Sequence, residues 1–317
     1  MIRNKKIFIT GGAGFIGSNL CKRLIDSNKI IIYDNCRRDA LKYTGLTGHK
    51  NLTIIKGDIL DKEKVAQAMG DAEIVIHLAA MAGVSSYYEE PIKTMEVNML
   101  GTYNVLEAAA KNKNLNLLVN FSTSEVYGPF VYGAKEDNPT AQGALPVSRW
   151  TYSVSKLAAE HLCFAYRSKH KLPVISIRPF NIYGPGQVGE GAIQIFVPQA
   201  LKGGDVTVTG DGTHIRAWCY IDDLVDGVLL AIENKKAIGE VFNIGNPSGT
   251  ITIIDLVKMI IRLCNSKSKI RWIAHQGQDV QLRVPDISKA KNILGFEPKI
   301  GLEEGLKRSI EWYKKYS

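Results

Sequence analysis

Tyr152 and Lys156 are four positions apart in the run Tyr-Ser-Val-Ser-Lys. If this run lies in a helix, both side chains project from one face, because residues four apart are neighbours on a helix surface. A lysine ammonium beside a phenol favours the phenolate and lowers the phenol pKa from about 10 toward neutrality. A phenolate can take a proton from a hydroxyl group while the adjacent carbon gives up a hydride. Taken alone, such a pair is commonplace and more often lies on a helix surface, but together with the two features that follow, it indicates alcohol oxidation with a bound hydride acceptor.

A second group with catalytic potential is Thr123-Ser124-Glu125, which follows the apolar run 115–121. We expect that run to be a strand, so two hydroxyl groups and a carboxylate lie at its C-terminal end. Open α/β sheets bind their ligands at this edge. The alternative is that Glu125 only hydrogen-bonds the surrounding turn.

Gly11, Gly14 and Gly17 supply the expected place for the hydride acceptor. They follow a predicted strand and open a predicted helix, the context in which such glycines permit a tight turn and close approach of the backbone to a pyrophosphate. The helix N-terminus adds free N–H groups and a partial positive charge. The spacing predicts a dinucleotide site.

Asp34 ends the second predicted strand, where a carboxylate would bond the adenosine ribose hydroxyls and repel a ribose phosphate. We therefore predict NAD as the cofactor, although Arg37 and Arg38 leave NADP open. Asp58 follows the third predicted strand and is placed to accept from the adenine amine. Its alternative role is an ordinary helix N-cap.

The elements that must position these residues alternate over the first 180 residues. We expect strands near 6–10, 30–33, 53–55, 73–78, 115–121 and 173–178, and helices at 14–26, 61–69, 91–111 and 150–170. The strands are apolar throughout, as strands covered on both faces must be. The pattern predicts the α/β class, with a Rossmann-type doubly wound parallel sheet.

The alternation stops after Pro179, where a loop rich in Gly and Pro begins. We therefore expect a dinucleotide-binding Rossmann domain at 1–182 and a smaller C-terminal α/β lobe for the substrate at 183–317. The run 241–245 predicts one more buried strand that returns to the first sheet.

Composition excludes several classes of function. The net charge of +9 is spread along the chain without a basic block, so an anionic small substrate or a solvated surface explains it as well as nucleic acid would. Five scattered cysteines and six histidines show no metal-ligand spacing, and an odd cysteine count fits a reducing compartment. The apolar runs are strand-length and the first residues are charged. We expect a cytoplasmic protein with no metal, nucleic-acid or membrane partner.

Taken together, the motifs resemble the extended short-chain dehydrogenase/reductase enzymes that act on nucleotide sugars. Further shared motifs lie at 77–80, 97–102, 178–185, 210–223, 243–247 and 283–290, so the resemblance covers essentially the whole chain. It implies that Tyr152 is the base, that Lys156 bonds the nicotinamide ribose, and that Thr123 hydrogen-bonds the sugar hydroxyl being oxidised. It also implies a homodimer in which the helices at 91–111 and 150–170 form a four-helix bundle.

The resemblance also implies the ligand contacts. The nucleotide sugar would be held by Ser85, Asn181, Arg216 and Arg283, since arginine grips phosphate oxygens bidentately, although each arginine could instead form a plain ion pair. The predicted NAD contacts are Gly11, Gly14, Phe15, Ile16, Gly17, Asp34, Asn35, Asp58, Ile59, Leu78, Ala79, Ala80, Asn98, Tyr152 and Lys156.

Oxidation at sugar C4 is the shared start of epimerisation, dehydration and decarboxylation. Family members that dehydrate typically carry Thr-Asp-Glu, so Ser124 weakens that reaction here. The Thr123-Ser124-Glu125 run, with strings at 91–94 and 149–156, instead resembles the UDP-glucuronate decarboxylases. Ser124 and Glu125 would orient the sugar carboxylate for loss as carbon dioxide. We therefore expect a UDP-hexuronate decarboxylase; the alternatives are, in order, a UDP-sugar 4-epimerase, a 4,6-dehydratase and a non-catalytic NAD-binding scaffold.

Overall fold

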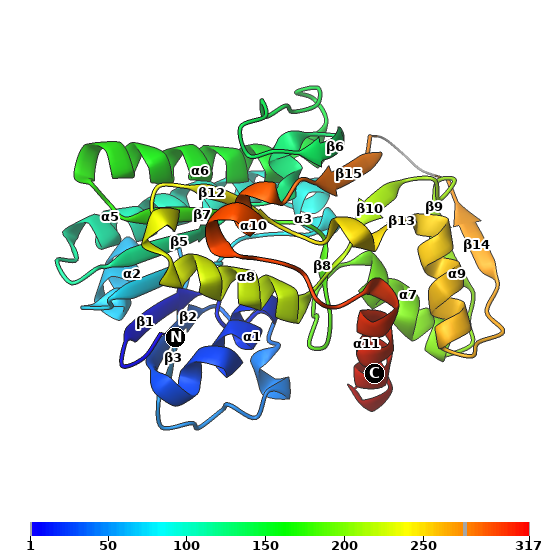
Figure 1. Ribbon diagram of the computed structural model, residues 1–317, viewed down its shortest axis with the longest axis horizontal. Helices are drawn as coiled ribbons and strands as arrows, with labels where there is room; N and C mark the ends of the chain where they lie inside the picture. The colour runs from blue at the N-terminus through cyan, green and yellow to red at the C-terminus, as the bar shows by residue number, and fades with distance from the viewer. Residues whose placement is uncertain (1, 275–277, 317) are drawn as a thin grey trace.

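A seven-stranded parallel sheet forms the centre of the protein (Figure 1). The structure, a computed structural model, describes residues 2–274 and 278–316, without the side chains of Val84 and Ser85. The strand order is β12-β7-β5-β4-β1-β2-β3, so the chain reverses direction across the sheet between β1 and β4. The strands are β1 (Lys6–Thr10), β2 (Lys29–Asp34), β3 (Leu52–Lys56), β4 (Ile74–His77), β5 (Leu117–Phe121), β7 (Val174–Pro179) and β12 (Val241–Ile244).

Helices cover both faces of this sheet. One face carries α2 (Lys62–Met69), α5 (Gly101–Lys111) and α6 (Thr151–His170), and the other carries α1 (Phe15–Leu24) and α8 (Ile221–Glu233) (Figure 1). Successive side chains of β1 point to opposite faces of the sheet, so Ile7 and Ile9 pack in one hydrophobic core and Phe8 packs in the other. The predicted sheet, its strands and the returning strand are therefore confirmed.

The predicted helix at 91–111 is interrupted. It consists of α4 (Pro91–Met95), a π-helical turn η3 (Glu96–Leu100) and α5. Asn98 lies in that turn, where its side chain accepts from the Met81 N–H at 2.7 Å and donates to the Met81 carbonyl at 3.0 Å. Turns of this type frequently occur at functional sites. Here the turn fixes the loop that follows β4.

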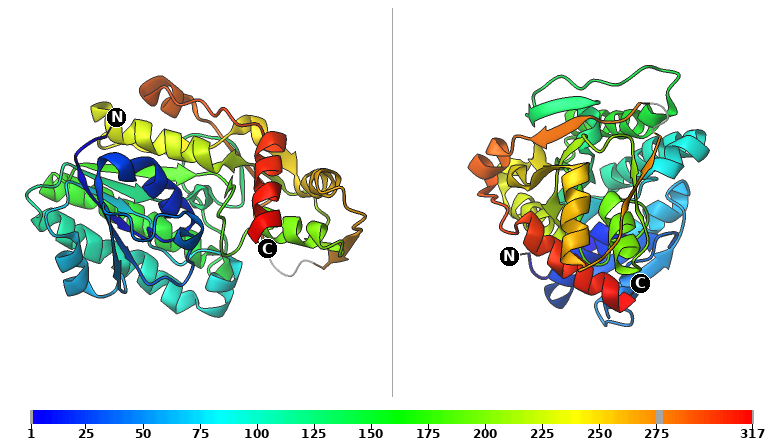
Figure 2. Two further views of the ribbon diagram at one scale, coloured as in Figure 1. Left: turned by 90° about the horizontal axis from the view of Figure 1, so that it is seen from below. Right: turned by 90° about the vertical axis from the view of Figure 1, so that its right-hand side faces the viewer.

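The C-terminal part forms a smaller second lobe, and the two parts exchange strands. Its four-stranded sheet has the order β13-β10-β15-β6, so β6 comes from the first half of the chain, whereas β12 returns to the large sheet. The helix α11 packs against α7 and α9 (Figure 2). The remaining strands are β6 (Phe130–Ala134), β8 (Ile182–Tyr183), β9 (Val206–Thr209), β10 (Ile215–Ala217), β11 (Cys219–Tyr220), β13 (Thr250–Thr252), β14 (Ile270–Ile273) and β15 (Leu282–Pro285). The remaining helices are α3 (Val84–Glu89), α7 (Ala192–Leu201), α9 (Ile253–Leu263), α10 (Ser288–Leu294) and α11 (Leu302–Tyr316).

None of the helices in the described residues is long and apolar enough to cross a lipid bilayer.

Candidate active site

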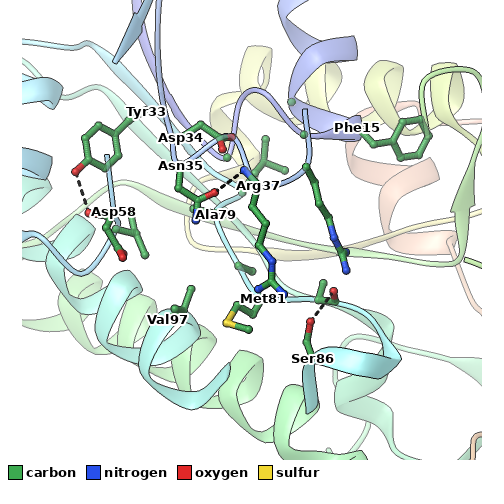
Figure 3. A pocket seen from close by; sticks show the side chains of 18 of the residues that line it. Phe15, Tyr33, Asp34, Asn35, Arg37, Asp58, Ala79, Met81, Ser86 and Val97 are labelled. Atoms are coloured by element: carbon green, nitrogen blue, oxygen red, sulfur yellow. Dashed lines mark hydrogen bonds between the residues drawn. The ribbon is translucent and has the colours of Figure 1, made fainter. Parts of the chain in front are cut away.

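A cleft of about 370 Å³ runs along the carboxyl ends of β1, β2 and β4 (Figure 3). This is where the strand order reverses, the position at which doubly wound sheets bind ligands. The predicted cofactor residues that line the cleft are Gly11, Gly14, Phe15, Ile16, Gly17, Asp34, Asn35, Asp58, Ile59, Leu78, Ala79 and Ala80.

The glycine loop packs closely against the rest of the fold at positions where no side chain would fit. Gly11 has a φ of +70°, and a Cβ there would lie 2.6 Å from the backbone nitrogen of Ala79. A Cβ at Gly17 would lie 2.6 Å from the carbonyl oxygen of Gly11. Helix α1 begins directly after Gly14, so its free N–H groups face the loop. This cradle fits a pyrophosphate.

Asp34 lines the cleft at the end of β2, and two backbone N–H groups hold its carboxylate. Its carboxylate accepts from the N–H of Ala13 at 3.0 Å and from the N–H of Cys36 at 2.8 Å. Burial raises the pKa of Asp34, and these two N–H groups act in the opposite direction. Asp58 also lines the cleft, but the side chain that caps α2 belongs to Asp61. The N-cap alternative for Asp58 is therefore wrong, and its contact with adenine stays a prediction.

Sequence reasoning missed part of the cleft. Met81, Val97 and Lys93 also line it, and Val188 reaches it from the loop that opens the second lobe. The Gly/Pro-rich composition of that loop was the available signal. The side chain of Asn98 is buried behind the cleft. It accepts from the Met81 N–H, and its amide nitrogen donates to the Ser155 hydroxyl at 2.9 Å.

Tyr152 and Lys156 lie in the first turns of α6, as predicted. Lys156 is buried, and burial lowers its pKa to about 8. Burial raises the pKa of Tyr152, and the Glu125 carboxylate raises it further, while a hydrogen bond with the Thr123 side chain and the charges of Arg283 and Arg149 lower it. Burial outweighs the lowering contributions and keeps the pKa of Tyr152 above its usual value, so the lowering expected from Lys156 stays a prediction for the complete site.

Glu125 forms a clamped ion pair with Arg149. The carboxylate oxygens of Glu125, in the 3₁₀ turn η4 (Ser124–Tyr127), accept from the two terminal nitrogens of Arg149 at 2.7 and 3.1 Å. Arg283 of β15 approaches the same carboxylate at 3.4 Å. Burial alone would raise the pKa of Glu125, but Arg283 and Arg149 outweigh it and hold that pKa below its ordinary value. Glu125 is therefore a carboxylate beside Tyr152.

Asp279 extends this cluster toward the second lobe. It lies 3.2 Å from Nε of Arg149 and 3.8 Å from Arg216. The parallel pairing of β10 with β15 sets Arg216 directly beside Arg283. Burial and the charge of Arg283 lower the pKa of Arg216 to about 10. Three guanidinium groups thus meet two carboxylates, and the positive excess suits an anionic ligand.

Arg283 has one more feature of an anion site. Its Nε is buried and has no acceptor among the described residues. The structure places Arg283 on Glu125, near Tyr152, and its expected contact with the nucleotide diphosphate stays a prediction. Arg149 and Asp279 are functional candidates that were absent from the predicted site.

The remaining predicted site residues are Asn181, Ser124 and Ser85. Asn181 follows β7 with a φ of +40°, and its amide donates to the Ala217 carbonyl at 3.0 Å. Ser124 is buried in η4. The side chain of Ser85 lies outside the described part of the structure.

The comparisons with known proteins agree with this arrangement. Residues 7–245 match the family described as "NAD dependent epimerase/dehydratase family". A UDP-N-acetyl-alpha-D-glucosaminuronate decarboxylase of Bacillus cytotoxicus is 37% identical, covering 98% of each chain. UDP-glucuronic acid decarboxylase 5 of Arabidopsis thaliana is 36% identical over 96% of this chain and 87% of its own length.

A solved structure shares the whole fold. The UDP-glucuronic acid 4-epimerase of Bacillus cereus, solved with UDP-glucuronic acid and NAD, has a TM-score of 0.90 and 31% identity, covering 98% of this chain and all of its own. The overall fold is therefore shared with an enzyme whose reaction differs from that of the two decarboxylases.

Proposed function

Because the chain belongs to the NAD-dependent epimerase/dehydratase family, we propose that this NAD-dependent enzyme decarboxylates a UDP-hexuronate after transient oxidation at sugar C4. The observation that carries the proposal is the Glu125 carboxylate, clamped by Arg149 and supported by Arg283 beside Tyr152. The decarboxylases among the relatives, at 37% and 36% identity, support the same reaction.

The first proposed step breaks the O–H and C–H bonds at C4 of the sugar. Tyr152 would take the hydroxyl proton after losing its own, which requires that the complete site offset the effect of burial on its pKa, and the Thr123 side chain that hydrogen-bonds Tyr152 would orient that hydroxyl. Lys156, buried one helical turn away, contributes its charge to the nicotinamide ribose and to the phenolate. NAD, when bound by the residues that line the cleft, would supply a reversible hydride acceptor, so that the sugar is not oxidised overall.

The second step breaks the bond from C5 to the carboxylate. A 4-keto uronate is a β-keto acid, whose carboxylate leaves as carbon dioxide while the bonding electrons move toward the ketone. One proton is then taken up at C5. The Ser124 hydroxyl would donate to the leaving carboxylate, and Glu125 would act through Arg149 and Arg283, whose guanidinium groups it holds in position to face that carboxylate. The positive excess of the arginines suits a substrate that carries a carboxylate in addition to a diphosphate.

The alternative reaction is 4-epimerisation of a UDP-sugar. The likeness to the solved 4-epimerase of Bacillus cereus, at 31% identity, favours it. It uses the same oxidation at C4, but the carboxylate is retained. Ser124 argues against dehydration, because it stands where a general acid would have to protonate the departing hydroxyl.

We further propose the assembly and the lobe roles. Residues 1–182 would bind NAD and residues 183–317 the nucleotide sugar. Ile92, Leu100 and Tyr103 expose apolar surface on α4, η3 and α5, which supports a homodimer through these helices and α6. Five free cysteines support a cytoplasmic location. A monomer in light scattering at micromolar concentration would contradict the dimer.

Mass spectrometry tests the reaction. The purified protein with NAD is incubated separately with UDP-glucuronate, UDP-N-acetylglucosaminuronate, UDP-glucose and dTDP-glucose. We expect carbon dioxide and a nucleotide sugar lighter by that mass from at least one uronate. Conversion of UDP-glucuronate to a product of equal mass, without carbon dioxide, would instead establish the epimerase.

A further inference from the structure

Two arginines that follow Asp34 are each bound by a carboxylate. Arg37 and Arg38 both line the cofactor cleft. Arg37 approaches Glu90 at 3.4 Å, and Arg38 approaches Glu190 at 3.1 Å. Free guanidinium groups at this end of the cleft would attract the 2′-phosphate of NADP, which carries a charge of about −1.5 to −2 at neutral pH. The partners of these arginines therefore bear on cofactor choice.

The two pairs are not equivalent. Arg37 and Glu90 are exposed on 58% and 47% of their side-chain surface, whereas the values for Arg38 and Glu190 are 33% and 29%. Exposed pairs contribute little, because water and salt screen them. The Arg38 pair is the better-shielded one, and its carboxylate comes from the second lobe.

Two glycines border the Arg38 side chain. A Cβ at Gly189 would lie 2.8 Å from Cδ, Nε and one terminal nitrogen of Arg38. A Cβ at Gly83 would lie 3.0 Å from the other terminal nitrogen and 2.8 Å from a carboxylate oxygen of Glu190. Both glycines have positive φ, +99° and +109°. The loops after β2 and β4 and the loop 184–191 thus meet around one guanidinium group.

This contact ties the second lobe to the cleft. Glu190 lies two residues after Val188, whose side chain lines the same cleft. Binding of Glu190 to Arg38 therefore holds the loop 184–191 against the adenosine side of the cofactor site. It also directs the charge of Arg38 toward a carboxylate of the protein.

We propose that Glu190 is a determinant of cofactor selectivity: by binding Arg38 it withholds that arginine from the 2′-phosphate of NADP and keeps the loop 184–191 over bound NAD. Asp34 would repel the 2′-phosphate directly, whereas Glu190 would remove the attraction between Arg38 and that phosphate. The inference rests on NAD binding and not on the reaction at the sugar.

The test measures affinities for NAD and NADP, and the NAD dissociation rate, in the full-length protein. Glu190→Gln keeps the size of the side chain and removes its charge. We expect NADP affinity to rise about tenfold, the value of one charge-assisted hydrogen bond, and NAD to dissociate several times faster. Glu90→Gln is the matched control on the exposed pair and should change each quantity less than twofold.

A second variant identifies the arginine responsible. In the Arg38→Met/Glu190→Gln double variant the gain in NADP affinity should disappear, because no guanidinium group is released. Unchanged NADP affinity in Glu190→Gln, or a gain that persists without Arg38, overturns the proposal. An NAD dissociation rate equal to that of the wild type would overturn the role of the loop contact.

Discussion

The cofactor cleft is built largely from backbone and glycine, whereas the cluster around Glu125 is built from charged side chains of separate segments. At the cleft, the loop after β1 packs so closely on Ala79 that a side chain at Gly11 could not fit. At the cluster, Glu125, Arg149 and Arg283 come from η4, η5 (Ser148–Trp150) and β15 and are held by ion pairs.

We infer from this difference that the cleft serves the cofactor and that the cluster serves the sugar. A backbone cradle binds a dinucleotide irrespective of the reaction at the sugar, and the solved 4-epimerase with NAD has the same fold at a TM-score of 0.90. Replacing a buried ion cluster by apolar residues is often neutral or stabilising, so we infer that this cluster serves ligand binding and not stability alone. We assign the oxidation to the first region and the fate of the carboxylate to the second.

The largest expected effect follows from removing the base between the two regions. Tyr152→Phe should lower turnover by about 10²–10⁴-fold, the usual value of a general base, because the Thr123 hydroxyl cannot replace a phenolate. NAD affinity should stay within about twofold of the wild type, since the cradle is unchanged. Steady-state turnover and calorimetric NAD binding measure the two quantities. Turnover within tenfold of the wild type would exclude Tyr152 as the base.

Breaking the clamp should destabilise the cluster in a pH-dependent manner. Arg149→Met removes the bidentate partner of Glu125, which is 19% exposed, so we expect about 2–3 kcal/mol of lost stability at neutral pH. In the wild type the pKa of Glu125 is lowered in the fold, so its stabilising contribution is present above the ordinary carboxyl pKa and is lost as pH falls through the lowered value. The difference between wild type and variant should therefore shrink in acid.

Denaturant unfolding at several pH values measures this difference. The control is Arg37→Met, which removes an exposed pair and should change stability by less than about 1 kcal/mol at every pH. If Arg149→Met destabilises the protein equally in acid and at neutral pH, the contradicting conclusion follows: Arg149 stabilises the fold by packing and not by its interaction with the Glu125 charge.

A smaller effect is expected at the adenosine end of the cleft. Asp34→Ala removes the acceptor of the Ala13 and Cys36 N–H groups and the carboxylate expected to bond the ribose. NAD affinity should fall about tenfold, while NADP affinity should fall less, because the repulsion of the 2′-phosphate is removed. Titration with both cofactors measures the ratio. An NADP affinity that drops as much as that of NAD would contradict the assigned role of Asp34.

The sequence predicted the cleft because its signals are local. Gly11, Gly14 and Gly17 lie on one turn, and Asp34 ends the adjacent strand, so spacing alone places them together. The cluster could not be found in this way. Arg149 lies 24 positions from Glu125 and 130 from Asp279, and no periodicity links segments so far apart. The π-helical turn at Glu96–Leu100 was also missed, since it depends on the contact of Asn98 with Met81.

The pKa of Tyr152 shows a related limit. Helical spacing identified Lys156 as its neighbour, but the depth of burial and the approach of Glu125 depend on the packing of η4 against α6. Those contacts are tertiary, and helical spacing carries no information about them.

The division of labour between cleft and cluster is tested most directly by a single-turnover reaction of the wild type and Glu125→Gln with UDP-glucuronate. Carbon dioxide and enzyme-bound reduced nicotinamide are measured in the same sample. The account predicts that Glu125→Gln still transfers hydride but releases at least about tenfold less carbon dioxide per hydride transferred, because Arg149 and Arg283 are no longer held in place to orient the sugar carboxylate. Equal losses of carbon dioxide and of hydride transfer, or no loss of either, would contradict it.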